Sequence, residues 1–142
     1  MQQDILEILR QKTAQYGLRR SAQREKVVKV FLSAKRHITA EDLLALVRKK
    51  YAEIGFATVY RTIKLLCRYG IANEIKIGSN KAMYELAAGK EHHDHLICIN
   101  CGAITEVFDK KIEALQDKLA QANDFKPLNH RMEIFGLCKK CK

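Results

Sequence analysis

The sequence has little proline and glycine, and it lacks long apolar runs. One proline, Pro127, and seven glycines are too few for a collagen-like or low-complexity chain. No apolar run approaches the roughly 20 residues of a membrane helix. Asp4 and Glu7 interrupt the apolar N-terminus, unlike a signal or transit peptide. With 47% hydrophobic residues over 142 positions, we expect a soluble cytoplasmic protein with a packed core and no membrane partner.

Acidic residues are scarce in the first part of the chain. Residues 1–86 contain 17 Lys and Arg but only 8 Asp and Glu, whereas residues 87–142 contain 9 and 8. A basic half suggests a polyanionic partner, because neutralised phosphates release condensed counterions. A solvated basic surface without a partner is the alternative that charge alone leaves open. All histidines except His37 and all cysteines except Cys67 lie in residues 87–142, which are therefore rich in metal ligands.

Apolar residues at helical spacing predict four helices in the basic half. They cover residues 4–15, about 22–34, a third helix starting at Ala40 with an apolar face that reaches Tyr51, and about 57–68. Ser21 and Thr39 are the expected N-caps of the second and third helices. Residues 71–86 then alternate between polar and apolar around a turn at 78–80, which predicts a hairpin.

Short helices followed by a hairpin are the order of a winged-helix DNA-binding domain. The last helix before the wing would enter the major groove of double-stranded DNA. Its polar face carries Thr58, Arg61, Lys64 and Arg68, and Tyr60 lies near its start. Arginine can contact guanine through two hydrogen bonds. The alternative is that Tyr60 is packing and Arg61 a surface charge, but the order of elements and the basic face favour DNA binding.

Two CxxC pairs indicate a metal site in the second half. Cys98 and Cys101 are separated from Cys138 and Cys141 by 36 residues, so a folded segment must lie between the pairs. Four cysteines satisfy a tetrahedral zinc(II) ion and leave no position for chemistry, so we expect a structural zinc. Disulfides are the weaker alternative in a cytosolic protein. Cys67 stands alone and is expected to be a packing residue.

A histidine-rich stretch at 91–95 precedes a predicted strand at 96–99. If it is extended, His93 and His95 point one way and His92 and Asp94 the other, which allows a metal on each face. A solvated polar linker is the alternative. Further candidate ligands are His37, Glu85, Glu106 on a return strand over 103–108, Glu113 on a helix over about 110–122 and His130 on a last strand over 128–135.

The helix predicted over 110–122 should cover the small sheet made by the strands around it. Its apolar face carries Ile112, Leu115 and Leu119, and Asp109 would open it. Two or three strands and one helix make a thin core, so burial through dimerisation is also expected.

These motifs together resemble the ferric uptake regulator family of bacterial metal-sensing repressors. The resemblance covers nearly the whole chain and rests on residues 56–61 (FATVYR), residues 92–98 (HHDHLIC), Cys101-Gly102, Asn129-His130 and the closing CxxC. It implies an α+β fold with a winged-helix DNA-binding domain (1–86), a hinge (87–91) and a metal-binding α/β dimerisation domain (92–142).

The resemblance also implies a role for each candidate residue. The regulatory metal site would comprise His37, Glu85, His93, His95 and Glu106, and the second site His92, Asp94, Glu113 and His130. The structural zinc site would comprise Cys98, Cys101, Cys138 and Cys141. DNA contacts would come from Arg19, Thr58, Tyr60, Arg61 and Lys64.

The ligand types narrow the choice of regulatory metal. Three imidazoles and two carboxylates suit Fe(II), Mn(II), Co(II) or Zn(II). Glutamate at 85 and 106 resembles the iron sensors of the family, whereas its peroxide sensors typically carry aspartate and its zinc sensors add a cysteine. We therefore expect an iron-responsive regulator, with manganese or peroxide sensing as the alternatives within the family.

The expected function is repression of metal-uptake genes by a metal-loaded homodimer, or a tetramer of paired dimers, on an A/T-rich inverted-repeat operator. One ion held by ligands from both domains would set the geometry of the dimer for DNA. Two alternatives come from other classes. An iron oxygenase would use His and carboxylate ligands, but five protein ligands leave little open coordination, so no enzymatic activity is expected. A zinc-stapled protein-interaction module without a DNA role is the other.

Overall fold

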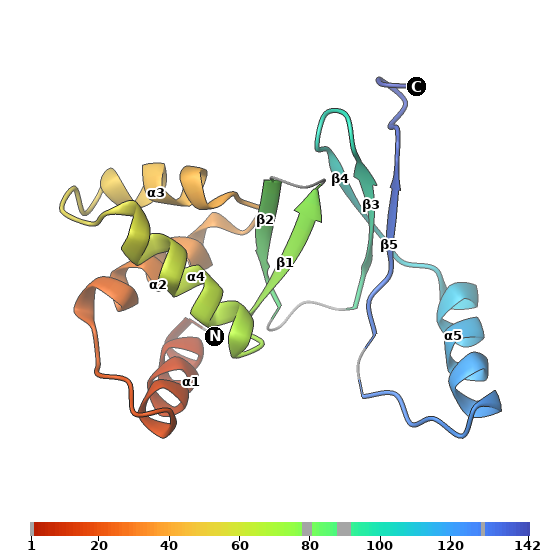
Figure 1. The fold of residues 1–142 in the computed structure, drawn as a ribbon, viewed down its shortest axis with the longest axis horizontal. Coiled ribbons are helices and arrows are strands. Elements are labelled where there is room, and N and C mark those ends of the chain that lie inside the picture. The colour runs from red at the N-terminus through yellow and green to blue at the C-terminus, as the bar shows by residue number, and fades with distance from the viewer. Residues whose placement is uncertain (1, 78–80, 88–91, 129) are drawn as a thin grey trace. The chain divides into compact units, whose positions relative to one another are not determined.

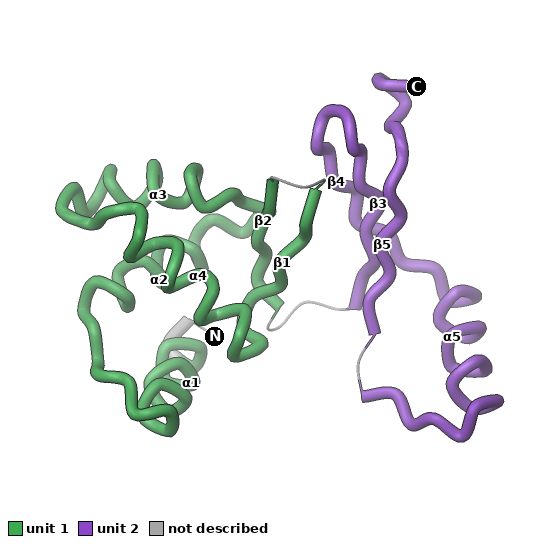
Figure 2. The backbone as a smooth tube through the Cα atoms, in the orientation of Figure 1, with its two compact units in different colours: residues 1–90 green, residues 91–142 purple. Residues whose placement is uncertain are grey.

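The computed structural model describes residues 2–77, 81–87, 92–128 and 130–142, and it divides into two compact units (Figure 2). Unit 1 comprises residues 1–90 and unit 2 residues 91–142. The predicted turn at 78–80, most of the predicted hinge at 88–91, and Asn129 lie outside the described residues. Within the described part of the chain, every helix is too short or too polar to cross a lipid bilayer.

The described residues of unit 1 form four helices followed by a two-stranded hairpin (Figure 1). These elements are α1 (Gln2–Gln15), α2 (Ala22–Ala34), α3 (Ala40–Arg48), α4 (Phe56–Arg68), β1 (Ala72–Ile77) and β2 (Lys81–Leu86). Both predicted N-caps are confirmed: the Ser21 hydroxyl accepts from the Arg24 N–H at 3.3 Å, and the Thr39 hydroxyl from the Asp42 N–H at 3.1 Å. The predicted winged-helix order is therefore confirmed, with α4 starting one residue earlier than expected.

The core of unit 1 fixes α4 against the other helices. Val59, Ile63 and Leu66 of α4 are fully buried, as are Val28 of α2 and Leu43 of α3. Burial of each such side chain stabilises the fold by about 1.5–3 kcal/mol. The apolar stripe of α4 thus faces inward, and its opposite face, which carries Arg61, is held rigidly toward the solvent.

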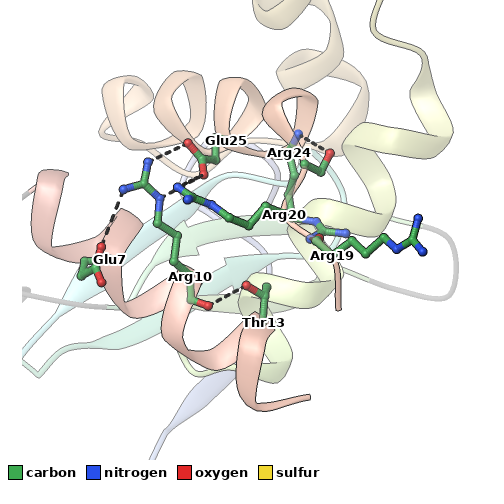
Figure 3. A network of polar contacts seen from close by, with 8 residues as sticks. Glu7, Arg10, Thr13, Arg19, Arg20, Arg24 and Glu25 are labelled. Carbon is green, nitrogen blue, oxygen red and sulfur yellow. Dashed lines mark hydrogen bonds and ion pairs between the residues drawn. The ribbon is translucent and has the colours of Figure 1, made fainter. Parts of the chain in front are cut away.

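A network of arginines and glutamates joins α1 to the start of α2 (Figure 3). The Arg10 guanidinium donates to both carboxylate oxygens of Glu25, at 3.0 and 2.9 Å, and Arg20 approaches the same carboxylate at 3.7 Å. Arg24 donates to the backbone carbonyl of Arg19 at 3.3 Å. This hydrogen bond to the Arg19 carbonyl therefore anchors the segment between α1 and α2, which carries Arg19, to α2.

Glu25→Gln is expected to lower the free energy of unfolding by about 1 kcal/mol at pH 7. The hydrogen bonds from Arg10 hold the pKa of the Glu25 carboxyl below its usual value. A lowered pKa in the folded state means that the stabilisation is complete above about pH 4.3, the usual pKa, and is lost as the pH falls further. Urea unfolding from pH 7 to pH 3 should show the difference between variant and wild type disappear at the acid end.

Glu7→Gln is the matched control for that variant. Glu7 approaches Arg10 at 3.6 Å, but 57% of its side chain is exposed. Exposed pairs of this kind contribute little, so its effect should stay below about 0.5 kcal/mol. Equal effects of the two substitutions would contradict the role assigned to Glu25.

Among its described residues, unit 2 has a three-stranded sheet and one helix. Strand β3 (Asp94–Cys98) lies between β4 (Ile104–Val107), to which it is antiparallel, and β5 (Glu133–Gly136), to which it is parallel. Helix α5 (Lys110–Ala122) connects β4 to β5, and the Asp109 carboxylate caps it by accepting from the N–H groups of Lys111 and Ile112.

Two predictions for unit 2 are wrong. The last strand was expected over 128–135 but begins at Glu133, so His130 lies in the segment before β5. Helix α5 was expected to cover the sheet, yet Leu115 and Leu119 are 64% and 67% exposed and no described residue of α5 is buried. A three-stranded sheet offers too little apolar surface to bury the helix, so its apolar face remains open to the solvent within one chain.

Candidate metal centres and nucleic-acid interface

The four cysteines of the two CxxC pairs converge at one end of the sheet of unit 2. Their sulfur atoms all lie within 4.8 Å of one another, and the Cys101 and Cys138 sulfurs are 3.7 Å apart. Each pair sits in a tight turn: the Gly102 N–H donates to the Cys98 carbonyl and the Cys141 N–H to the Cys138 carbonyl, both at 2.9 Å. Gly102 has φ +73°, a conformation that glycine adopts without strain.

This tetrad fits a zinc ion. Four sulfurs at about 2.3 Å from a tetrahedral zinc would be roughly 3.8 Å apart, close to the Cys101–Cys138 separation. Backbone N–H groups of Cys101 and Cys138 donate to the Cys98 sulfur and lower the pKa of that thiol to about 6, which favours the thiolate that zinc binds. Cys67 is separate from the tetrad: it lies half-buried on α4, where burial raises its pKa to about 11.

A second cluster in unit 2 contains His92, Asp94, Glu113 and His130. His130 Nε2 lies 3.0 Å from one Glu113 oxygen, His92 Nε2 lies 3.4 Å from the other, and the same His92 nitrogen is 3.5 Å from Asp94. Although the buried His92 Nε2 and Glu113 Oε1 atoms are 3.4 Å apart, neither makes a hydrogen bond to a described residue. Two imidazoles and a carboxylate that converge in this way suit a divalent metal.

His93, His95 and Glu106 meet on the opposite face of β3. The rings of His93 and His95 are 4.9 Å apart, and His93 Nε2 lies 3.7 Å from a Glu106 oxygen. His95 is opposite Glu106 in the β3–β4 register and is only 1% exposed. The structure thus separates these residues from His92 and Asp94 as strand alternation requires.

His37 and Glu85 form a pair in unit 1. A backbone bridge between Ile38 and Tyr84, with N···O distances of 3.0 and 2.8 Å, aligns the two segments, and His37 Nε2 lies 3.3 Å from a Glu85 oxygen. Glu85 is 1% exposed, and Asn73 also donates to its carboxylate at 3.4 Å. A carboxylate is rarely buried without a cationic or metal partner, so this pair is a candidate half of a metal site.

A basic groove runs along the exposed face of α4. It has a volume of about 510 Å³, and its lining includes Arg24, Thr58, Tyr60, Arg61, Lys64 and Arg68. Tyr60 is 43% exposed and stacks on Phe56, with ring centroids 5.9 Å apart. Four of the five predicted DNA contacts are thus gathered here, while Arg19 is exposed on the segment before α2.

Sequence reasoning missed a basic residue that lines this groove, Arg24, and an acidic residue that pairs with one of its lysines, Glu74. Arg24 reaches it from α2, and the sequence holds no local signal that α2 and α4 share a surface. Glu74 of β1 pairs with Lys64, although strand alternation alone could not show which helix its carboxylate meets. Both contacts depend on the packing of elements that are distant in sequence.

The ferric uptake regulator family matches residues 15–135. A ferric uptake regulation protein of Neisseria gonorrhoeae is 37% identical over 127 residues, which are 89% of this chain and 88% of the relative. The solved structure of the Helicobacter pylori ferric uptake regulator, described as having three functional metal binding sites, has a TM-score of 0.85 at 35% identity and covers 99% and 93% of the two chains. The regulator of Francisella tularensis with iron gives 0.74 at 32% identity, over 89% and 96%.

Proposed function

Because the chain belongs to the ferric uptake regulator family, we propose that it is a metal-responsive repressor that binds operator DNA as a homodimer and controls metal-uptake genes. The observation that carries this proposal is the presence, in one unit, of a basic groove on α4 and a buried His37–Glu85 pair. A unit that reads DNA therefore also carries candidate metal ligands, which is what a direct coupling between the two functions requires.

The regulatory ion is proposed to take His37 and Glu85 from unit 1 and His93, His95 and Glu106 from unit 2. The donor chemistry of each half supports this, since three imidazoles and two carboxylates suit a borderline divalent ion such as Fe(II). Mn(II), Co(II) and Zn(II) fit the same donors. The cluster of His92, Asp94, Glu113 and His130 is proposed as the second site, and the four cysteines as the structural zinc site.

Because its proposed ligands come from both units, the regulatory ion would couple metal binding to the orientation of α4. His37 and Glu85, once fixed to the ligands of unit 2, would restrain the orientation of α4, and in a dimer would set the separation of two recognition helices. Half-sites on one face of B-DNA repeat every roughly 34 Å, so the separation governs affinity. A metal at 100 times its dissociation constant favours the competent form by about 2.7 kcal/mol, or about a hundredfold.

The exposed apolar face of α5 supports the proposed homodimer. Leu115 and Leu119 of α5, and Phe125 in the segment that follows it, are each more than 60% exposed in a single chain. A second copy of unit 2 would bury them, and an operator with two-fold symmetry, such as an A/T-rich inverted repeat, would match that assembly.

The proposal is tested by fluorescence anisotropy on a labelled A/T-rich inverted-repeat duplex. Chelated protein should bind weakly, and addition of Mn(II) or anaerobic Fe(II) should raise the affinity about a hundredfold. Arg61→Ala should then lower the affinity of the metal-loaded protein by about 10- to 100-fold. It removes a positive charge that attracts DNA phosphates and a guanidinium that can contact guanine.

The matched control is Lys29→Ala, a basic residue of α2 that lies outside the groove. It should change the affinity by less than about threefold, because distant surface charges are screened. Equal binding with and without metal would contradict the metal response. If the wild-type protein bound no DNA of any sequence, the result would instead favour the protein-interaction module.

A further inference from the structure

An ion pair lies at the edge of the basic groove of α4. The Lys64 ammonium on α4 contacts the carboxylate of Glu74 on β1. The Lys64 side chain is 39% exposed and that of Glu74 is 21% exposed, so the acidic partner is the more enclosed of the two. The same contact raises the pKa of Lys64, which keeps the ammonium charged.

Lys64 differs in this respect from the arginines that share the groove. Within the described part of the chain, the side chains of Arg61 and Arg68 have neither an ion pair nor a hydrogen bond. Arg61 and Arg68 thus present unneutralised charge, whereas Lys64 and Glu74 together contribute no net charge to the groove. The charge of one basic residue on α4, Lys64, is therefore already neutralised when a polyanion approaches the groove.

We propose that Glu74 is an internal counter-charge that holds Lys64 away from DNA phosphates and thereby limits the sequence-independent affinity of the protein for DNA. This inference rests on the proposed function, because it assigns a specificity-determining residue to the same groove. Lys64, predicted as a direct contact, then contributes little to binding while Glu74 is present.

The excess of basic residues in unit 1 explains why such a counter-charge would matter. Residues 1–86 carry 17 basic and 8 acidic residues, so unit 1 is attracted to any duplex. A genome offers roughly 10⁶–10⁹ competing non-specific sites, and each added phosphate contact strengthens binding to all of them. An acidic residue placed at the groove removes one such contact without touching Arg61 or Tyr60, which can read bases.

The size of the effect follows from counterion release. Each neutralised phosphate adds about 0.9 to the slope of log affinity against log salt concentration, which amounts to about a fivefold gain at 0.15 M salt. Glu74→Gln keeps the shape of the side chain and frees Lys64. In a dimer, two freed lysines should steepen the slope by about 1.8 and raise affinity for non-operator DNA about 30-fold.

The experiment measures anisotropy of a labelled duplex without an inverted repeat, with Mn(II)-loaded protein, from about 50 to 300 mM salt. Variants are Glu74→Gln, Lys64→Gln and the double variant. Glu53→Gln is the matched control: it makes the same charge change in unit 1, at a glutamate that pairs at 2.9 Å with Lys26, which is not among the residues lining the groove. Thermal unfolding establishes that each variant is folded.

The expected result for Glu74→Gln is a steeper slope of log affinity against log salt concentration. Lys64→Gln and the double variant should keep a slope near that of the wild type, and Glu53→Gln should leave the slope unchanged. A fall in slope for the double variant as large as that for Arg61→Ala would overturn the counter-charge role, since Lys64 would then already contact phosphate in the wild type. So would an unchanged slope in Glu74→Gln. Wild-type protein that binds neither this duplex nor the inverted repeat would contradict the proposed function itself, which separates the two failures.

Discussion

Replacing Cys138 with serine is expected to remove the structural zinc and unfold unit 2. Structural zinc contributes about 10–16 kcal/mol of apparent free energy in isolated zinc-finger peptides, which matches or exceeds the whole stability of a small domain. Unit 2 depends on it strongly, because its sheet has three strands and α5 has no buried residue among those described. Tightly bound zinc per chain should fall from one to none, and hydrogen exchange should show unit 2 unprotected while unit 1 stays protected.

Cys67→Ala is the matched control, because it removes the one cysteine outside the tetrad. Zinc content measured after dialysis against a weak chelator should be unchanged, and stability should fall by no more than about 1–2 kcal/mol from lost packing in unit 1. A Cys138→Ser protein that still holds one zinc and keeps unit 2 protected would contradict the structural role assigned to the tetrad.

His95→Ala is expected to reduce metal-dependent DNA affinity about a hundredfold. His95 is almost fully buried beside His93 and opposite Glu106, so its loss removes an imidazole from the centre of the proposed regulatory ligand set. Without full ligation the metal no longer favours the competent form, and the roughly 2.7 kcal/mol that the switch requires is lost. Anisotropy with and without Mn(II) measures this directly, and circular dichroism checks the fold.

His130→Ala makes the comparison specific to one cluster. It also removes one imidazole from unit 2, but from the cluster with Glu113 on the other face of β3. Its effect on metal-dependent DNA affinity should be at least about tenfold smaller than that of His95→Ala. The reverse order would exchange the roles proposed for the two clusters.

The helices and the hairpin of unit 1 were predictable because local signals agreed. Ser21 and Thr39 capped helices as their side-chain chemistry requires, and the apolar period of α4 placed Val59 and Ile63 inward. The separation of His93 and His95 from His92 followed from strand alternation alone. These features depend on residues within a few positions of one another, which is the range over which sequence patterns are informative.

The errors arose where packing between distant elements decides the structure. The apolar period of Leu115 and Leu119 correctly indicated a helix, but it could not show that the sheet of one chain is too small to bury it. The last strand begins only at Glu133, because β5 pairs with β3 over a short register from His95 to Cys98. The Lys64–Glu74 pair depends on how α4 packs beside β1, which no pattern in either element reveals.

The central claim is that one ion, bound by residues from both units, is coupled to DNA binding. Coupling between two ligands is reciprocal, and the proposed homodimer holds one regulatory ion in each chain. If the two ions together tighten DNA binding about a hundredfold, each ion must bind about tenfold more tightly when DNA is present. The most direct test is a Mn(II) titration of zinc-loaded protein with and without a saturating inverted-repeat duplex. A shift of about one decade in the dissociation constant for Mn(II), absent in His95→Ala, is the predicted result. Identical metal affinity with and without the duplex would contradict the account.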